Sequence, residues 1–84
     1  MPEVSSVVVD LVTEAVGQPV AEVVPTTRFG ELPGWGSLSA LRLLAALEAR
    51  LAVRLDLREY LAIQDVGGLV NAVTVVLARG QVGT

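Results

Sequence analysis

The segment that most restricts how this chain can fold runs from Ser37 to Ala52 and has the apolar spacing of an α-helix. Placed at about 100° per residue, its apolar side chains fall on two stripes. The stripe predicted to face the core consists of Ala40, Leu43, Leu44, Leu47 and Leu51. The second consists of Leu38, Leu41 and Ala45, bordered by Glu48 and Arg42. We expect the second stripe to stay exposed for a partner, the alternative being a helix covered on both sides.

The N-terminal segment, residues 4–16, also favours a helix. Its apolar face consists of Val4, Val7, Val8, Leu11 and Ala15. The run of valines at 7–9 would also suit a strand, because β-branched side chains lose rotamer freedom in a helix. The apolar period is nearer 3.6 than 2, so we predict a helix that stops at Gly17 and Pro19.

The C-terminal third of the chain predicts one short and one long helix. Residues 57–61 suit a helix of one or two turns, after an extended linker at 53–56. Asp65 is a suitable N-cap for the long helix, which Arg79 and Gly80 would end. Its predicted apolar face is Val66, Leu69, Val70, Val73 and Leu77. Gly67 and Gly68 should permit close packing at its start, and residues 81–84 should fray.

The connection at residues 18–36 is rich in proline and glycine and long for a structureless loop in a small domain. It should therefore pack as an ordered arm or carry function. The apolar residues expected to anchor it are Val23, Val24, Phe29 and Leu32.

These segments together predict an all-α fold, a four-helix bundle with three main helices and one short helix. The length of 84 residues suits one domain, 1–84, with an ordered core at about 4–79. Apolar residues make up 52% of the chain but aromatic residues only 4%, so the core must be built from Val, Leu and Ala. We expect a monomer.

The composition excludes several classes of function. The chain has no cysteine and no histidine, which rules out thiolate or imidazole metal sites and histidine-dependent catalysis. No lysine is present, and a pairing of Glu31 with Glu48 is weak evidence for catalysis, so we do not expect an enzyme. The net charge of −3 is the wrong sign for nucleic acid. The uncharged stretch 66–78 is too short to cross a bilayer, and we expect a soluble, cytoplasmic protein without membrane contact.

The sequence Gly34-Trp35-Gly36-Ser37-Leu38 is where turn-forming residues give way to the central helix. Backbone N–H groups and the helix dipole favour an anion there, so a phosphoester on Ser37 would be well placed. The simpler interpretation is that Ser37 only caps the helix.

This stretch resembles the Asp-Ser-Leu motif that opens the second helix of acyl and peptidyl carrier proteins. The resemblance spans residues 4–79, and its further matching positions are Phe29, Leu32, Leu43, Leu47, Glu48, Leu51, Asp65, Val66, Gly67, Gly68, Leu69 and Val70. It implies that Ser37 receives 4′-phosphopantetheine from coenzyme A through a separate phosphopantetheinyl transferase. The arm would then hold acyl or aminoacyl groups as thioesters, while the protein itself catalyses nothing.

Two departures from the family pattern bear on partners. Gly36 stands where the family usually has Asp, an acid thought to help the transferase engage the serine. The helix at 37–52 holds two arginines and one glutamate, a net of +1, where fatty-acid carriers are strongly acidic. Docking should therefore depend on apolar contact more than on charge. The residues expected to meet partners are Trp35, Gly36, Leu38, Leu41, Arg42 and Ala45.

The predicted function is thus a stand-alone carrier of polyketide or nonribosomal-peptide type biosynthesis. Its partners would be loading and transfer enzymes of the adenylation, ketosynthase, condensation or tailoring type. The alternative is a helical docking domain that keeps the carrier fold without the prosthetic group, and a more distant one is a small regulatory binder.

Overall fold

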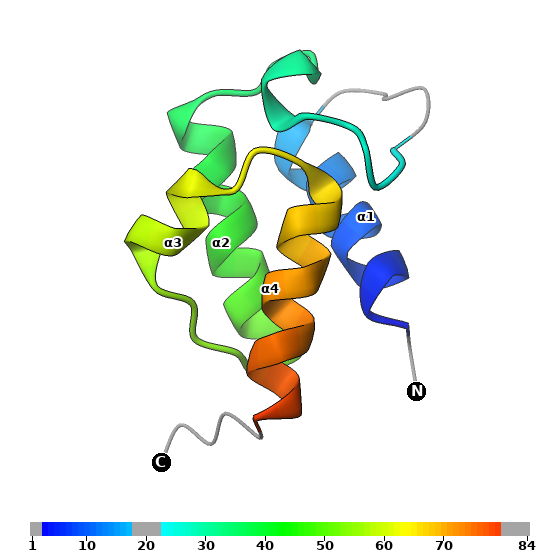
Figure 1. Ribbon diagram of the computed structural model, residues 1–84. Coiled ribbons are helices and arrows are strands. Elements are labelled where there is room, and N and C mark those ends of the chain that lie inside the picture. Colours follow the sequence, from blue (N-terminus) through cyan, green and yellow to red (C-terminus); the bar gives the residue numbers. More distant parts are fainter. Residues whose placement is uncertain (1–2, 18–22, 80–84) are drawn as a thin grey trace.

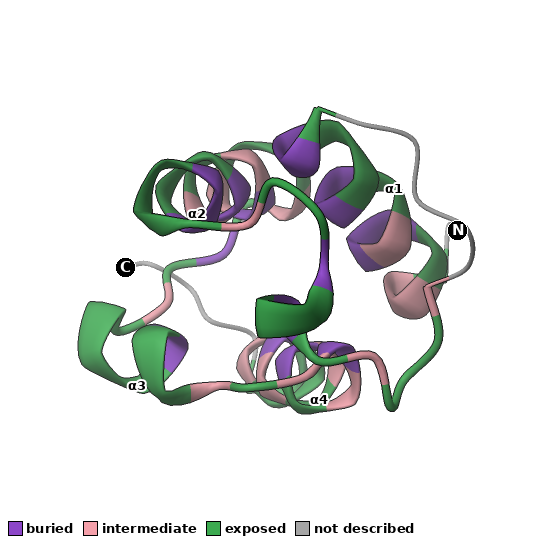
Figure 2. Cartoon of the chain, turned by 90° about the horizontal axis from the view of Figure 1, so that it is seen from above, coloured by how far each residue is buried: buried purple, intermediate pink, exposed green. Residues whose placement is uncertain are grey.

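The computed structural model describes residues 3–17 and 23–79, which form four α-helices and one short 3₁₀-helix (Figure 1). The helices are α1 (Val4–Val16), η1 (Phe29–Glu31), α2 (Ser37–Leu51), α3 (Leu57–Ala62) and α4 (Val66–Ala78). The predicted arrangement of three main helices and one short helix is confirmed. Viewed from above, α1, α2 and α4 surround the core, and α3 lies on the side away from α1 (Figure 2).

The core is mainly aliphatic, as the composition requires, and Phe29 and Tyr60 are its buried aromatic residues. Its most deeply buried large side chains are Leu11, Leu43, Leu47, Leu69, Val8, Val12, Val53, Val66 and Val73. Each such side chain contributes about 1.5–3 kcal/mol by leaving water. The predicted core stripe of α2 is confirmed, with Ala40, Leu43 and Leu47 buried and Leu44 and Leu51 partly buried against them.

Residues 4–16 are helical although valine favours strands, because the valine face of α1 packs on α2 and α4. The helix ends as predicted at Gly17, whose φ of 72° lies in the left-handed region that glycine adopts readily. The Gly17 N–H donates to the Thr13 carbonyl at 3.3 Å. Pro19, the second predicted stop signal, lies outside the described residues.

The described part of the long connection crosses the end of the bundle where α2 and α4 begin (Figure 1). It is joined to the start of α4 by three backbone hydrogen bonds: Phe29 N–H to Gln64 O at 3.0 Å, Val66 N–H to Thr27 O at 3.0 Å, and Gly67 N–H to Pro25 O at 2.8 Å. A Cβ on Gly67 would lie 3.0 Å from the Pro25 oxygen, so any larger residue would push the loop away by a few tenths of an ångström. The close packing predicted at this position is confirmed.

Three of the four predicted anchors of this connection pack as expected. Phe29 and Leu32 are buried, and Val23 packs partly buried against the core. The prediction for Val24 is wrong, because this residue lies at a turn in which its carbonyl accepts from Thr27 N–H at 2.9 Å, and its side chain is exposed.

Aspartates cap the last two helices. Asp65 accepts from Gly68 N–H at 2.7 Å at the start of α4, as predicted, and Asp56 accepts from Glu59 N–H at 3.1 Å at the start of α3. Leu77, predicted to face the core, is exposed. Figure 1 shows the reason: the last turn of α4 extends past the ends of α1 and α2. The C-cap is Arg79, and the predicted stop at Gly80 and the frayed 81–84 lie outside the described residues.

Tyr60 fastens α3 to the bundle. It is the buried residue of this two-turn helix, and its hydroxyl donates to the Ala40 carbonyl of α2. Burial raises the pKa of Tyr60 from 10.0 to about 12, because the charged phenolate loses its water.

We predict that alkaline pH will destabilise the fold through Tyr60. Its pKa is higher in the folded chain, so its contribution is complete below pH 10 and is lost as the pH rises from about 10 to about 12. The expected loss is about 2 kcal/mol. The chain has one tyrosine and no lysine or cysteine, so phenolate absorbance reports this group directly.

The matched control is Tyr60→Phe, which keeps the ring and removes the titrating hydroxyl. Its free energy of unfolding should be lower than that of the wild type at pH 8 and change little between pH 10 and 12. Parallel loss of stability in both proteins over that range would contradict the assignment.

Candidate functional site

Ser37 is the first residue of α2, and its side chain is exposed. The N-cap position is occupied by Gly36, whose backbone is extended, and no side chain caps the helix. The interpretation of Ser37 as the cap is therefore wrong, because capping is performed by the residue just before the first turn. Among the described residues, the Ser37 hydroxyl has no hydrogen-bond partner and remains accessible for chemistry.

The start of α2 also leaves backbone donors uncommitted. The first hydrogen bond of this helix runs from Ala40 N–H to the Gly36 carbonyl at 2.9 Å. Within the described chain, the N–H groups of Ser37, Leu38 and Ser39 have no acceptor. Such donors, with the positive end of the helix dipole, favour a negative group at the helix start.

Ser39, two residues further on, holds the loop in place. It is buried, and its Oγ donates to the Gly34 carbonyl at 2.8 Å. Gly34 has a φ of 79°, which lets the chain turn sharply before α2. No pattern in the sequence points to Ser39, since its role depends on where the Gly34 carbonyl lies in the folded loop.

Trp35 packs on the loop side of the site. Its ring stacks on Phe29 with centroids 4.8 Å apart and planes 17° apart, and it is partly buried against the core. This stack fixes the approach of the chain to Gly36 and leaves part of the indole accessible to a partner.

The second stripe of α2 is exposed, as predicted. Leu38 is 61% exposed and Leu41 is 51% exposed, and Arg42 and Ala45 are also exposed. These residues share one helix face that begins beside Ser37. Two leucines of α3, Leu57 and Leu61, are similarly exposed and were missed by the sequence reasoning. A helix of two turns that buries one residue on the core, here Tyr60, leaves its other side in solvent. The short length predicted for this helix was therefore a signal that some of its leucines would be exposed.

The comparison with family models identifies the family. The model described as phosphopantetheine attachment site matches residues 6–73, most of the chain. The chain belongs to this family. It is therefore a carrier protein, and the prosthetic group of the family is 4′-phosphopantetheine. Its general partners are a phosphopantetheinyl transferase and acyl-handling enzymes.

The fold comparison agrees with this assignment. The structure is similar to the solution NMR structure of holo acyl carrier protein from Geobacter metallireducens, with a TM-score of 0.78 and 23% sequence identity. The similarity covers 96% of this chain and 92% of that chain, and it confirms the predicted carrier-protein fold. Comparison with curated protein sequences finds no match.

The surroundings of Ser37 fit a phosphopantetheine group. The hydroxyl is exposed, the adjacent N–H groups are uncommitted, and a Cβ on Gly36 would meet nothing within 4 Å. The start of α4, by contrast, already uses its amides on Asp65 and on loop carbonyls. No helix within residues 3–17 and 23–79 is long and apolar enough to cross a membrane.

We predict that Ser39→Ala will loosen the loop before α2. The substitution removes the donor to the Gly34 carbonyl and should lower the free energy of unfolding by about 1 kcal/mol. Trp35 is the single tryptophan, so its fluorescence should shift towards that of a solvated indole. Ser6→Ala, at an exposed position of α1, is the control and should change neither quantity. Unaltered stability and fluorescence in Ser39→Ala would mean that the bond contributes nothing.

Proposed function

We propose that Ser37 is the attachment residue and that this chain carries acyl or aminoacyl thioesters in polyketide or nonribosomal-peptide type biosynthesis. The observation that carries the proposal is the uncommitted Ser37 hydroxyl at the uncapped start of α2, inside the matched region 6–73.

The chemistry divides between the chain and its partners. In a reaction catalysed by a transferase, the Ser37 oxygen would form the phosphoester bond as the pyrophosphate bond of coenzyme A breaks. Adenosine 3′,5′-bisphosphate would leave, and the hydroxyl proton would be lost to a base of the transferase. The free N–H groups at the start of α2 favour the phosphate charge. When bound, the group supplies the thiol that the chain lacks, and that thiol holds the cargo as a thioester. The bundle keeps Ser37 and its neighbours in a fixed position for several enzymes in turn.

The charge of α2 supports the type of pathway. Arg42 and Arg50 against Glu48 give this helix a net charge of +1. Such a helix steers basic partners weakly, so association must depend more on apolar contact. The exposed Leu38, Leu41 and Ala45 supply that contact next to Ser37. An apolar docking face of this kind suits adenylation, ketosynthase, condensation or tailoring enzymes that bind through apolar contact.

Loading of Ser37 is tested by intact mass. Incubation of the chain with coenzyme A and a broad-specificity phosphopantetheinyl transferase should add the mass of one phosphopantetheine group. Ser37→Ala should gain nothing, and Ser6→Ala should gain the full mass. If the wild type gains no mass, or Ser37→Ala gains as much, the assignment of Ser37 is wrong and the docking-domain alternative is favoured.

The unusual Gly36 provides a second test. An Asp at this position has room, because a Cβ there meets nothing within 4 Å and the backbone is extended. Carrier proteins usually have Asp at this position, where the acid is thought to help the transferase engage the serine. Gly36→Asp should therefore increase the initial rate of loading. Stability should change by only a few tenths of a kcal/mol, because glycine and aspartate are both acceptable N-caps.

Gly36→Ala is the matched control for this change. It adds a Cβ without a carboxylate, so its loading rate should stay near that of the wild type. Equal rates for Gly36→Asp and Gly36→Ala would show that the acid has no part in recognition here.

The mode of docking is tested at Leu41. Leu41→Glu places a charge on the apolar stripe and should lower the initial loading rate about tenfold, the effect of losing about 1.4 kcal/mol of contact. Added salt should lower the rate about twofold or less. Leu77→Glu, at the exposed end of α4, is the control. Strong salt sensitivity with an unaffected Leu41→Glu would overturn apolar docking.

A further inference from the structure

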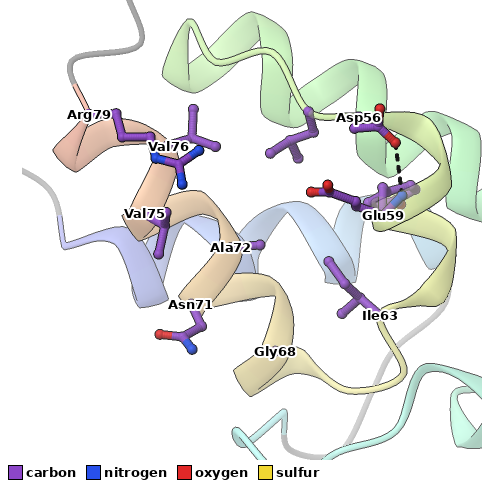
Figure 3. A pocket seen from close by; sticks show the side chains of 11 residues that line it. Asp56, Glu59, Ile63, Gly68, Asn71, Ala72, Val75, Val76 and Arg79 are labelled. Atoms are coloured by element: carbon purple, nitrogen blue, oxygen red, sulfur yellow. Dashed lines mark hydrogen bonds between the residues drawn. The ribbon is translucent and has the colours of Figure 1, made fainter.

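Two hollows of the molecule meet at α3. The larger, here called the α3–α4 groove, has a volume of about 380 Å³ (Figure 3). Its lining includes Leu55, Ile63, Asn71, Val75 and Arg79. The smaller, here called the Trp35 cavity, has a volume of about 90 Å³ and is lined by Phe29, Trp35, Ala40, Tyr60, Leu61 and Ile63. Tyr60 and Ile63 line both hollows, so these two residues lie between them and are here called the wall.

The wall is firmly held. Tyr60 is 5% exposed and its hydroxyl donates to the Ala40 carbonyl, so its ring is fixed at both ends. The Ile63 N–H donates to the Tyr60 carbonyl at 3.1 Å, which ties the second wall residue to the first. Opening the wall would require the buried hydroxyl to lose its acceptor, which is costly in a dry interior.

The Trp35 cavity lies on the side of the attachment site. Trp35 precedes Ser37 by two residues, and Ala40 follows it by one turn of α2. The α3–α4 groove extends away from that side along α4, as far as Arg79 (Figure 3). Its lining combines polar residues, among them Asp56, Glu59, Asn71 and Arg79, with an aliphatic part. The aliphatic part, Leu55, Ile63, Val75 and Val76, would favour a hydrocarbon chain that reached it.

We propose that Tyr60 is a barrier that keeps an apolar group borne on Ser37 out of the α3–α4 groove. This inference rests on the proposed attachment at Ser37. The small cavity beside Trp35 admits at most a short part of such a group, and the phenol ring closes the direct route from this cavity to the α3–α4 groove. The cargo then stays outside the bundle, where partner enzymes can reach it without first extracting it.

The test compares chemical shifts in the loaded protein. Wild type and Tyr60→Ala are loaded with an octanoyl-bearing phosphopantetheine group, checked by intact mass, and compared with the same proteins carrying the group without octanoate. In the wild type, the amide signals of Asn71, Ala72 and Val75 should not differ between the two forms. In Tyr60→Ala they should shift, because the cavity and the groove are joined.

Two further variants separate the barrier from general effects on α3. Tyr60→Phe keeps the ring and should behave like the wild type, and Leu57→Ala, an exposed change in the same helix, should do the same. Octanoyl-dependent shifts at the groove in the wild type would overturn the proposal, and so would their absence in a folded Tyr60→Ala. If Tyr60→Ala does not fold, Tyr60→Leu replaces it, with the same outcomes deciding.

An independent arm separates this proposal from the loading of Ser37. The chain contains no cysteine, so Ser37→Cys provides a unique thiol that N-octylmaleimide alkylates without any transferase. The same amides are then followed with and without Tyr60→Ala. Shifts that appear only when Tyr60 is removed support the barrier even if the transferase fails to load Ser37. Shifts with Tyr60 present contradict the barrier, whatever the mass experiment shows.

Discussion

The hydrogen bonds between the long loop and the start of α4 are the constraint on which the site depends. The carbonyls of Pro25 and Thr27 accept from Gly67 and Val66, and this pairing requires the close approach that Gly67 permits. The loop is thereby held over the end of the bundle, with Phe29 buried. Phe29 in turn supports Trp35, which leads directly into α2. The loop uses the free amides of α4 and leaves those of α2 available.

A division of roles between two serines follows from helix geometry. Ser37 and Ser39 lie about 200° apart around the axis of α2, so they face nearly opposite sides. The side of Ser39 meets the loop, and its hydroxyl is used on the Gly34 carbonyl. The side of Ser37 meets solvent, and its hydroxyl is left for chemistry. A rigid loop beside a free hydroxyl is what a carrier requires, because several enzymes must find the same atom in the same place.

The short helix α3 contacts the core through one buried residue, Tyr60, whereas each main helix buries several residues. Its stability depends on Tyr60, which packs against α2, while Leu57 and Leu61 remain in solvent. Together with Leu38 and Leu41 of α2, these leucines are the most exposed large apolar side chains among the described residues. The same tyrosine lines both the α3–α4 groove and the Trp35 cavity. The proposed barrier and the attachment of α3 to the bundle thus depend on the same side chain.

Local sequence patterns were enough to predict the four helices, the core stripe of α2, the cap at Asp65 and the exposed stripe of Leu38 and Leu41. These features depend on periodicity and on neighbours along the chain, which local patterns record. The errors at Val24 and Leu77 arose where exposure depends on what covers a turn or a helix end. The roles of Ser39 and Tyr60 could be seen only in the folded chain, because each donates to a carbonyl whose position is set by the fold. The fold also shows that Ser37 is not the cap, because the backbone turn into α2 places Gly36 at the N-cap position and leaves the Ser37 hydroxyl free.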